Sequence, residues 1–87
     1  MQVLESAPSS TYRLAEEHLG GANTLKDFDL RQRTGVTVLA VCRGEETLIT
    51  PAADMPLATG DVLVMAGSHE EIGKAQKHLD GMLKAGG

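Results

Sequence analysis

The pattern of apolar and polar positions marks out three strand-like segments. Residues 36–42 (VTVLAVC) are apolar at every position except Thr37, and β-branched side chains dominate the run. Such a run predicts a central strand that is covered on both faces. Residues 62–66 (VLVMA) predict a second fully apolar strand, whereas residues 11–16 (TYRLAE) alternate and predict a half-buried one.

A short helix is predicted between the half-buried strand and the central one. Asn23 and Thr24 are good N-caps, and Asp27 stands three residues after Thr24, where its carboxylate can complete a capping box. The apolar residues of this segment do not all share one face of a single straight helix. A break is therefore expected near Asp29, and Gly35 is expected to end the helix.

The second half of the chain predicts a hairpin and a longer helix. After a turn at residues 43–46 (RGEE), residues 47–50 (TLIT) predict a short strand that Pro51 terminates. Ser68 and Glu71 show the S-x-x-E pattern of a capping box. Apolar residues then recur at helical spacing, at Ile72, Ala75, Leu79 and Met82.

These elements follow one another as strand, helix, three strands and helix (β-α-β-β-β-α). We therefore expect the α+β class, with a small, mostly antiparallel sheet and two helices. The 87 residues suffice for one domain. Residues 1–10 are interpreted as a linker or a remnant foreign to the domain, residues 11–83 as the domain, and residues 84–87 as a disordered tail.

The amino-acid composition limits the kinds of partner that the domain is expected to bind. The formal net charge is -4, and the eight Lys and Arg residues are scattered. Nucleic acid needs a basic stripe and anionic lipid needs a basic cluster, so neither is expected to bind directly. A domain this small buries only about 60% of its unfolded surface, which favours a homodimer. With no signal peptide, no bilayer-spanning stretch and a single cysteine, the domain is expected to be cytoplasmic.

The sequence shows no recognisable catalytic or metal centre. The histidines lack metal-ligand spacing, and they stand at His18, His69 and His78. Cys42 ends an apolar run and is expected to pack in the core. Asp61 is expected to bond the amides of a tight turn. We therefore expect no enzymatic activity and no metal site.

An ordered set of short motifs resembles a known family. The marks are Thr24, Leu25, the DLR tripeptide at residues 29–31, Gly35, Arg43, Gly44, Pro51, Leu57, Gly60, Asp61 and Gly67. In this order and spacing they resemble the C-terminal regulator-of-potassium-conductance domain, also called the TrkA-C or RCK-C domain. The resemblance covers nearly the whole chain after residue 11. It implies a dimeric regulatory domain in the cytoplasm, held at the inner face of the membrane by a potassium channel, a potassium uptake system or a cation/proton antiporter.

The resemblance also implies a candidate ligand site. Some family members bind cyclic di-AMP between two copies of the domain. Matched by motif, the contact positions in this chain are Leu25, Arg31, Thr37, Val38 and Pro51. Arg31 would meet the nucleobase, and Leu25 and Val38 would enclose it. Pro51 would close the pocket, and the backbone near Thr37 would add a further contact.

Alternatives stand beside this interpretation. A planar guanidinium can pair with a phosphate or a purine edge, but Arg31 can equally make only a surface ion pair while Leu25 belongs to the core. The chain departs from the pattern of cyclic di-AMP binders at Gln32, where those proteins carry a small residue, so another small effector is an alternative ligand. The alternative function is a purely structural dimerisation module that binds no ligand.

Overall fold

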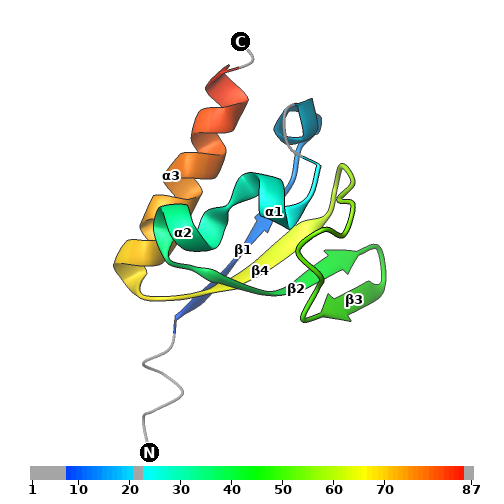
Figure 1. Ribbon diagram of the computed structural model, residues 1–87, viewed down its shortest axis with the longest axis horizontal. Coiled ribbons are helices and arrows are strands. Elements are labelled where there is room, and N and C mark those ends of the chain that lie inside the picture. The colour runs from blue at the N-terminus through cyan, green and yellow to red at the C-terminus, as the bar shows by residue number, and fades with distance from the viewer. Residues whose placement is uncertain (1–7, 21–22, 86–87) are drawn as a thin grey trace, which may run out of the picture.

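The structure follows the predicted order of elements. The computed structural model describes residues 8–20 and 23–85. Along the chain the elements are β1 (Ser9–Arg13), the 3-10 helix η2 (Glu16–Gly20), α1 (Leu25–Phe28), α2 (Leu30–Thr34), β2 (Thr37–Arg43), β3 (Glu46–Ile49), β4 (Val62–Ala66) and α3 (His69–Ala85). Relative to the prediction, η2 is additional and the first helix is divided in two (Figure 1).

The four strands form one antiparallel sheet in the order β1-β4-β2-β3. β4 lies inside the sheet and pairs with β1 and β2, so that Ala66 stands opposite Ser9 on one side and Thr37 on the other. β2 and β3 form a hairpin closed by Arg43 and Glu46. The predicted α+β class and antiparallel sheet are confirmed.

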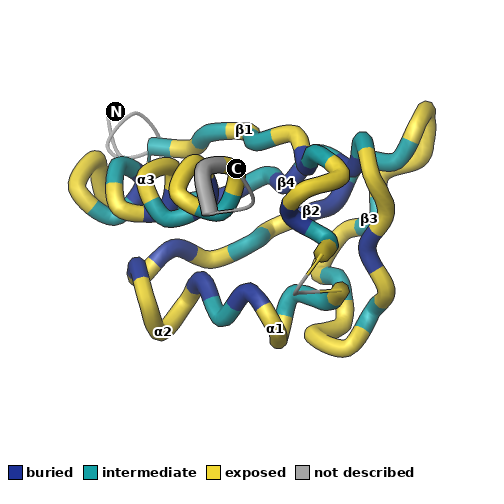
Figure 2. The backbone as a smooth tube through the Cα atoms, turned by 90° about the horizontal axis from the view of Figure 1, so that it is seen from above, coloured by how far each residue is buried: buried dark blue, intermediate teal, exposed yellow. Residues whose placement is uncertain are grey.

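The core lies between the sheet and the helices. Val41 of β2 and Leu63 and Met65 of β4 are fully buried, and they form one apolar cluster with Phe28 of α1 and Leu79 of α3. Figure 2 shows the buried parts of the strands and helices turned toward one another. The core is aliphatic apart from the single phenylalanine ring, as the composition indicates.

The prediction that the central strand is covered on both faces is wrong for the described chain. Leu39 of β2 is 45% exposed, and Ile49 on the neighbouring β3 is 76% exposed. The pairing of β2 with β4 shifts between Val38 and Ala40, and Val38 packs against the core. On the other side of β2, Ala40 stands opposite the exposed Ile49. The sequence pattern could not reveal this exposure, because a strand with one exposed apolar face shows the same run of apolar residues as a strand buried on both faces.

The bounds of β1 and the end of α3 differ from the prediction by two or three residues, and the bounds of β2 and β3 differ by one residue at each end. β1 begins at Ser9 and ends at Arg13. The Leu14 N–H still donates to the Asp61 carbonyl (2.7 Å), but the Asp61 N–H donates to the Ala58 carbonyl (3.0 Å) within the loop, so the regular pairing stops there. The boundary drawn at residue 10 therefore falls inside β1. α3 continues to Ala85, past the boundary drawn at residue 83, because the added residues are good helix formers. Residues 1–7 and 86–87 lie outside the described residues.

The break in the first helical segment occurs at Asp29, as predicted. Thr24 caps α1 through the Asp27 N–H (3.2 Å), and the Asp27 carboxylate accepts from the Thr24 N–H (3.2 Å). Asp29 then adopts a left-handed conformation (φ 53°, ψ 40°), which a short polar side chain tolerates better than most. Gly35 ends α2 with φ 92°. α1 therefore ends at its C-cap, Asp29, and α2 begins with the next residue, Leu30.

The cap of α3 also forms as predicted. The Glu71 N–H donates to the Ser68 hydroxyl (3.1 Å), and the Ser68 N–H donates to the Glu71 carboxylate (2.9 Å). Three of the four apolar residues at helical spacing are buried, namely Ile72, Ala75 and Leu79. Within the described residues, no helix is sufficiently long and apolar to span a bilayer.

His18 and Cys42 occupy places that the sequence did not indicate. His18 lies in η2 and is fully buried: its Nδ1 accepts from the Ala15 N–H (2.8 Å), so Nε2 is the nitrogen that donates to the Leu79 carbonyl (3.0 Å). Cys42 is only partly buried, and its Sγ lies 3.9 Å from the Thr47 hydroxyl on the adjacent strand. The predicted core position of Cys42 is therefore wrong, because it belongs to the face of the sheet that carries Ile49 and Ala40.

Candidate functional site

One cavity of about 340 Å³ lies between α1, α2, the start of β2 and the loop after β3. The five residues that the family resemblance singled out all line it: Leu25, Arg31, Thr37, Val38 and Pro51. Six further residues complete the lining: Lys26, Asp29, Leu30, Gln32, Val36 and Ala53. Positions as far apart in the sequence as residues 25 and 53 therefore meet at one site.

The left-handed turn at Asp29 shapes this cavity. It ends α1 and starts α2 in a new direction, so Leu25 at the start of one helix and Arg31 in the other both reach the same space. Gly35 closes α2 by donating its N–H to the Arg31 carbonyl (2.9 Å), and β2 begins two residues later at Thr37. The end of α2 and the start of β2 thus form two adjoining walls of the cavity.

The third wall is the loop after β3, and backbone hydrogen bonds hold it against α1. The Lys26 N–H donates to the Ala53 carbonyl (2.9 Å), and the Leu57 N–H donates to the Asn23 carbonyl (2.8 Å). Thr24 and Pro56 form an isolated β-bridge between the same two segments. No sequence pattern marks Lys26 or Ala53 as lining residues, because backbone pairing between distant segments brings the loop to the helix.

Two cationic side chains and one carboxylate line the cavity: Lys26, Arg31 and Asp29. The Asp29 carboxylate also lies 4.0 Å from the Arg33 guanidinium, in a pair that is exposed on both sides and therefore weak. Nearby, the Asn23 N–H, followed by the Thr24 hydroxyl, holds the pKa of Asp27 below its ordinary value. The positive charges of Lys26 and Arg31 give the cavity a local character opposite to the net charge of -4.

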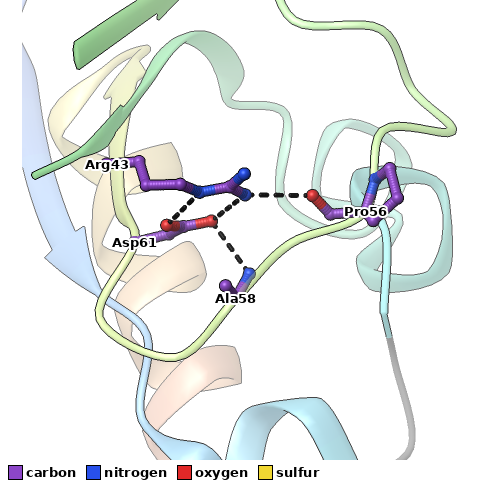
Figure 3. A network of polar contacts seen from close by, with 4 residues as sticks. All are labelled: Arg43, Pro56, Ala58 and Asp61. Atoms are coloured by element: carbon purple, nitrogen blue, oxygen red, sulfur yellow. Dashed lines mark hydrogen bonds and ion pairs between the residues drawn. The ribbon is translucent and has the colours of Figure 1, made fainter.

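A cluster of polar contacts around Arg43 and Asp61 lies where the same loop leads into β4 (Figure 3). Asp61 is 1% exposed and accepts from Arg43 at both oxygens, Nε to Oδ1 at 2.9 Å and Nη2 to Oδ2 at 2.7 Å. The same Nη2 donates to the Pro56 carbonyl (3.1 Å), and the Ala58 N–H donates to Asp61 Oδ2 (2.9 Å). The bonds from Arg43 lower the pKa of Asp61, against the opposing effect of burial.

The prediction for Asp61 was therefore incomplete. The bond from the Ala58 N–H is the local turn contact that the sequence indicated. The ion pair with Arg43 was missed, although one signal for it exists: an aspartate followed directly by an apolar strand is liable to be buried, and a buried carboxylate requires a cation or several donors. Within residues 8–20 and 23–85, no three His, Cys, Asp or Glu side chains are placed to hold a metal ion.

Comparison with known proteins identifies the family. The sequence model of the TrkA-C domain matches residues 22–80. The chain belongs to the TrkA-C domain family. Membership confirms the resemblance drawn from the ordered motifs, and the matched region contains every residue that lines the cavity.

The relatives of this TrkA-C domain include potassium transport proteins. The Ktr system potassium uptake protein C of Bacillus subtilis is 33% identical over 66 residues, which are 76% of this chain and 29% of that protein. The chain spans less than a third of the length of the curated relatives it matches.

Two solved structures share the fold. One is the RCK C domain of the potassium transport protein KtrA in complex with cyclic di-AMP, at 25% identity and a TM-score of 0.77, with 87% of each chain covered. The other is an RCK_C domain dimer of Streptococcus agalactiae BusR, also in complex with cyclic di-AMP, at 17% identity and a TM-score of 0.71. That comparison covers 86% of this chain and 93% of the BusR chain.

Proposed function

We propose that this TrkA-C domain is the ligand-sensing part of a potassium or other cation transport protein. Two copies associate, and an anionic nucleotide, cyclic di-AMP in the first instance, binds in the cavity at their interface. The single observation that carries the proposal is the convergence of Leu25, Arg31, Thr37, Val38 and Pro51 on one cavity. The domain acts in the cytoplasm, at the inner face of the membrane that holds its transport protein.

The size and lining of the cavity suit part of such a ligand. About 340 Å³ is at the low end of the volumes of small-molecule sites, so one copy of the domain accommodates part of a dinucleotide and a second copy encloses the rest. Leu25, Val38 and Pro51 offer apolar surface to a planar base. The dimer of the BusR domain with cyclic di-AMP supports this arrangement by analogy of fold.

The charges of the cavity favour an anion. Arg31 can form two parallel hydrogen bonds to a phosphate or a purine edge, whereas Lys26 contributes a single compact charge at the same cavity. Asp29 is drawn toward Arg33 at the surface, which reduces its repulsion of an anionic ligand. Gln32, the position that departs from the pattern of cyclic di-AMP binders, also lines the cavity and offers an amide to the ligand.

Binding of cyclic di-AMP to the purified chain tests the proposal. Isothermal titration of the wild-type protein is expected to show saturable binding, and Arg31→Ala is expected to weaken it by at least about tenfold because a charge-assisted bidentate contact is lost. Lys77→Ala is the control, since it also removes one positive charge, and Lys77 is exposed on α3 and is not among the residues that line the cavity. Equal loss in both variants, or no binding by the wild type, would refute the assignment of this ligand to this cavity.

The open face of the sheet favours a second candidate function, a structural dimerisation module. Leu39 and Ile49 are exposed, and the same apolar patch on a second copy is their natural complement. Ile49→Asp is expected to abolish self-association in analytical ultracentrifugation if the module dimerises through this face. If Arg31→Ala leaves transport regulation intact while Ile49→Asp abolishes it, the structural function is favoured over ligand sensing.

A further inference from the structure

The wall of the cavity formed by Pro51 and Ala53 belongs to a long connection without regular secondary structure. Residues 50–61 join β3 to β4 and cross the end of the molecule between them (Figure 1). A chain of this length has many conformations of similar energy unless specific contacts select one. The position of this wall therefore depends on what holds the loop.

One set of contacts fixes the loop to α1. The Lys26 N–H bonds the Ala53 carbonyl and the Leu57 N–H bonds the Asn23 carbonyl, so the loop follows α1 as a backbone pair. These bonds keep Ala53 beside Lys26 on the cavity wall. They do not place α1 and the loop relative to β2, which forms the opposite wall.

The Thr50 N–H ties the start of the loop to β2 by donating to the Leu39 carbonyl (2.9 Å), and one side chain ties the far half of the loop to the same strand. Arg43 is the last residue of β2, the strand whose first residues, Thr37 and Val38, line the cavity. Its guanidinium binds both Asp61 oxygens and the Pro56 carbonyl (Figure 3). A single rigid group thus joins the strand to the loop at two separate points.

The geometry requires arginine at this place. The planar guanidinium presents donors in a fixed fork, so Nε and Nη2 engage the carboxylate while Nη2 also reaches the carbonyl of Pro56. A lysine ammonium keeps the charge but is a single flexible donor group, and it cannot hold the same acceptors at the same angles. Arg43→Lys therefore keeps a positive charge beside Asp61 but removes the planar fork that orients the loop.

We propose that Arg43 is a positioning residue for the ligand cavity. It is not among the residues that line the cavity. It holds residues 56–61 to the end of β2, and through the Ala53 and Leu57 backbone bonds it sets the distance between the loop and α1 on one side and β2 on the other. Its effect on ligand affinity rests on the proposed function, whereas its effect on the loop does not.

The test has two arms on the intact 87-residue chain. In the first, hydrogen exchange of individual backbone amides is followed by NMR. Arg43→Lys is expected to reduce the protection of the Lys26 and Leu57 amides by about tenfold or more, with little change at Ile72, whose N–H bonds Ser68 in α3. Asp61→Asn, which retains the shape of the side chain, is expected to show the same local pattern.

In the second arm, the affinity for cyclic di-AMP is measured by isothermal titration. Arg43→Lys is expected to raise Kd by about tenfold, because the wall is no longer held in one place. Tyr12→Phe is the control: it removes the bond from the Tyr12 hydroxyl to Asp80 (2.6 Å), away from the cavity, and is expected to leave Kd unchanged.

Each failure has its own meaning. Unchanged protection at Lys26 and Leu57, or an equal loss at Ile72, overturns the positioning role, since the bonds then act only on global stability. Local loss of protection with an unchanged Kd overturns the link to the ligand. If the wild-type chain does not bind cyclic di-AMP, the proposed function fails for that nucleotide, and the exchange arm alone decides whether Arg43 positions the loop.

Discussion

Replacement of Gly35 by alanine is expected to lower the free energy of unfolding by about 2–3 kcal/mol. Gly35 ends α2 with φ 92°, a conformation that costs an L residue with a side chain about 1–2 kcal/mol. A Cβ at this position would also lie 2.6 Å from Oε2 and 2.9 Å from Cδ of Glu71, closer than real contacts allow. The substitution therefore combines backbone strain with a steric clash.

The clash is costly because Glu71 is not free to move away. Its carboxylate accepts from the Ser68 N–H (2.9 Å) and completes the cap of α3, a contact that contributes about 1 kcal/mol. For a domain of 87 residues, the total corresponds to a fall in Tm of about 10–20 °C. Thermal and urea unfolding followed by circular dichroism measure the change.

Gly73→Ala is the matched control for this prediction. A Cβ at Gly73 meets nothing within 4 Å, and the residue lies inside α3, so the same substitution is expected to stabilise the domain by about 0.5–1 kcal/mol. In a double-mutant cycle, Glu71→Ala should recover part of the cost of Gly35→Ala because the carboxylate is gone. The reasoning is refuted if Gly35→Ala stays within about 0.5 kcal/mol of the wild type, or if the two single changes add without coupling.

Three further predictions concern the core and the buried polar groups. Leu63→Ala, at a fully buried position of β4, is expected to lower the free energy of unfolding by about 2–5 kcal/mol in urea titrations, and a smaller loss would show that the core collapses into the space. His18→Ala should cost about 2–4 kcal/mol, because the Ala15 N–H and the Leu79 carbonyl both lose their buried partner; an unchanged midpoint would contradict these bonds. Because Arg43 lowers the pKa of Asp61 in the folded state, the stability this carboxylate contributes is fully present above the ordinary value of 3.8 and is lost as the pH falls below it. Urea midpoints between neutral pH and the acid range should therefore fall less steeply for Asp61→Asn than for the wild type, and identical slopes would exclude this linkage.

Much of the fold could be predicted because its signals are local. The break at Asp29, the end of α2 at Gly35 and the cap at Ser68 each depend on a few neighbouring residues whose side chains satisfy or redirect the backbone. The bounds of β4 were predicted as observed, because a turn on each side frames its apolar run. Strand ends that depend on a distant partner were less accurate, as at β1, where the pairing with β4 stops because the Asp61 N–H bonds the Ala58 carbonyl within the loop.

The residues of the candidate site likewise fall into those that the sequence could predict and those that it could not. Leu25, Arg31, Thr37, Val38 and Pro51 could be named from motifs, since the family pattern already contains the result of folding. No local signal pointed to Lys26 and Ala53, the neighbours of these residues on the cavity wall, because a backbone hydrogen bond between distant segments brings them together.

The sequence by itself determined the order of the elements, their caps and the family, because periodicity, turn chemistry and motif spacing are properties of short segments. Tertiary structure alone decided which apolar face is covered, since Leu39 and Ile49 satisfy the pattern of buried residues and are nevertheless exposed. It also decided that Asp61 pairs with Arg43, 18 residues away, because burial of a carboxylate becomes costly only when the loop closes over it. Burial and long-range pairing depend on the assembled sheet, and a linear pattern does not contain them.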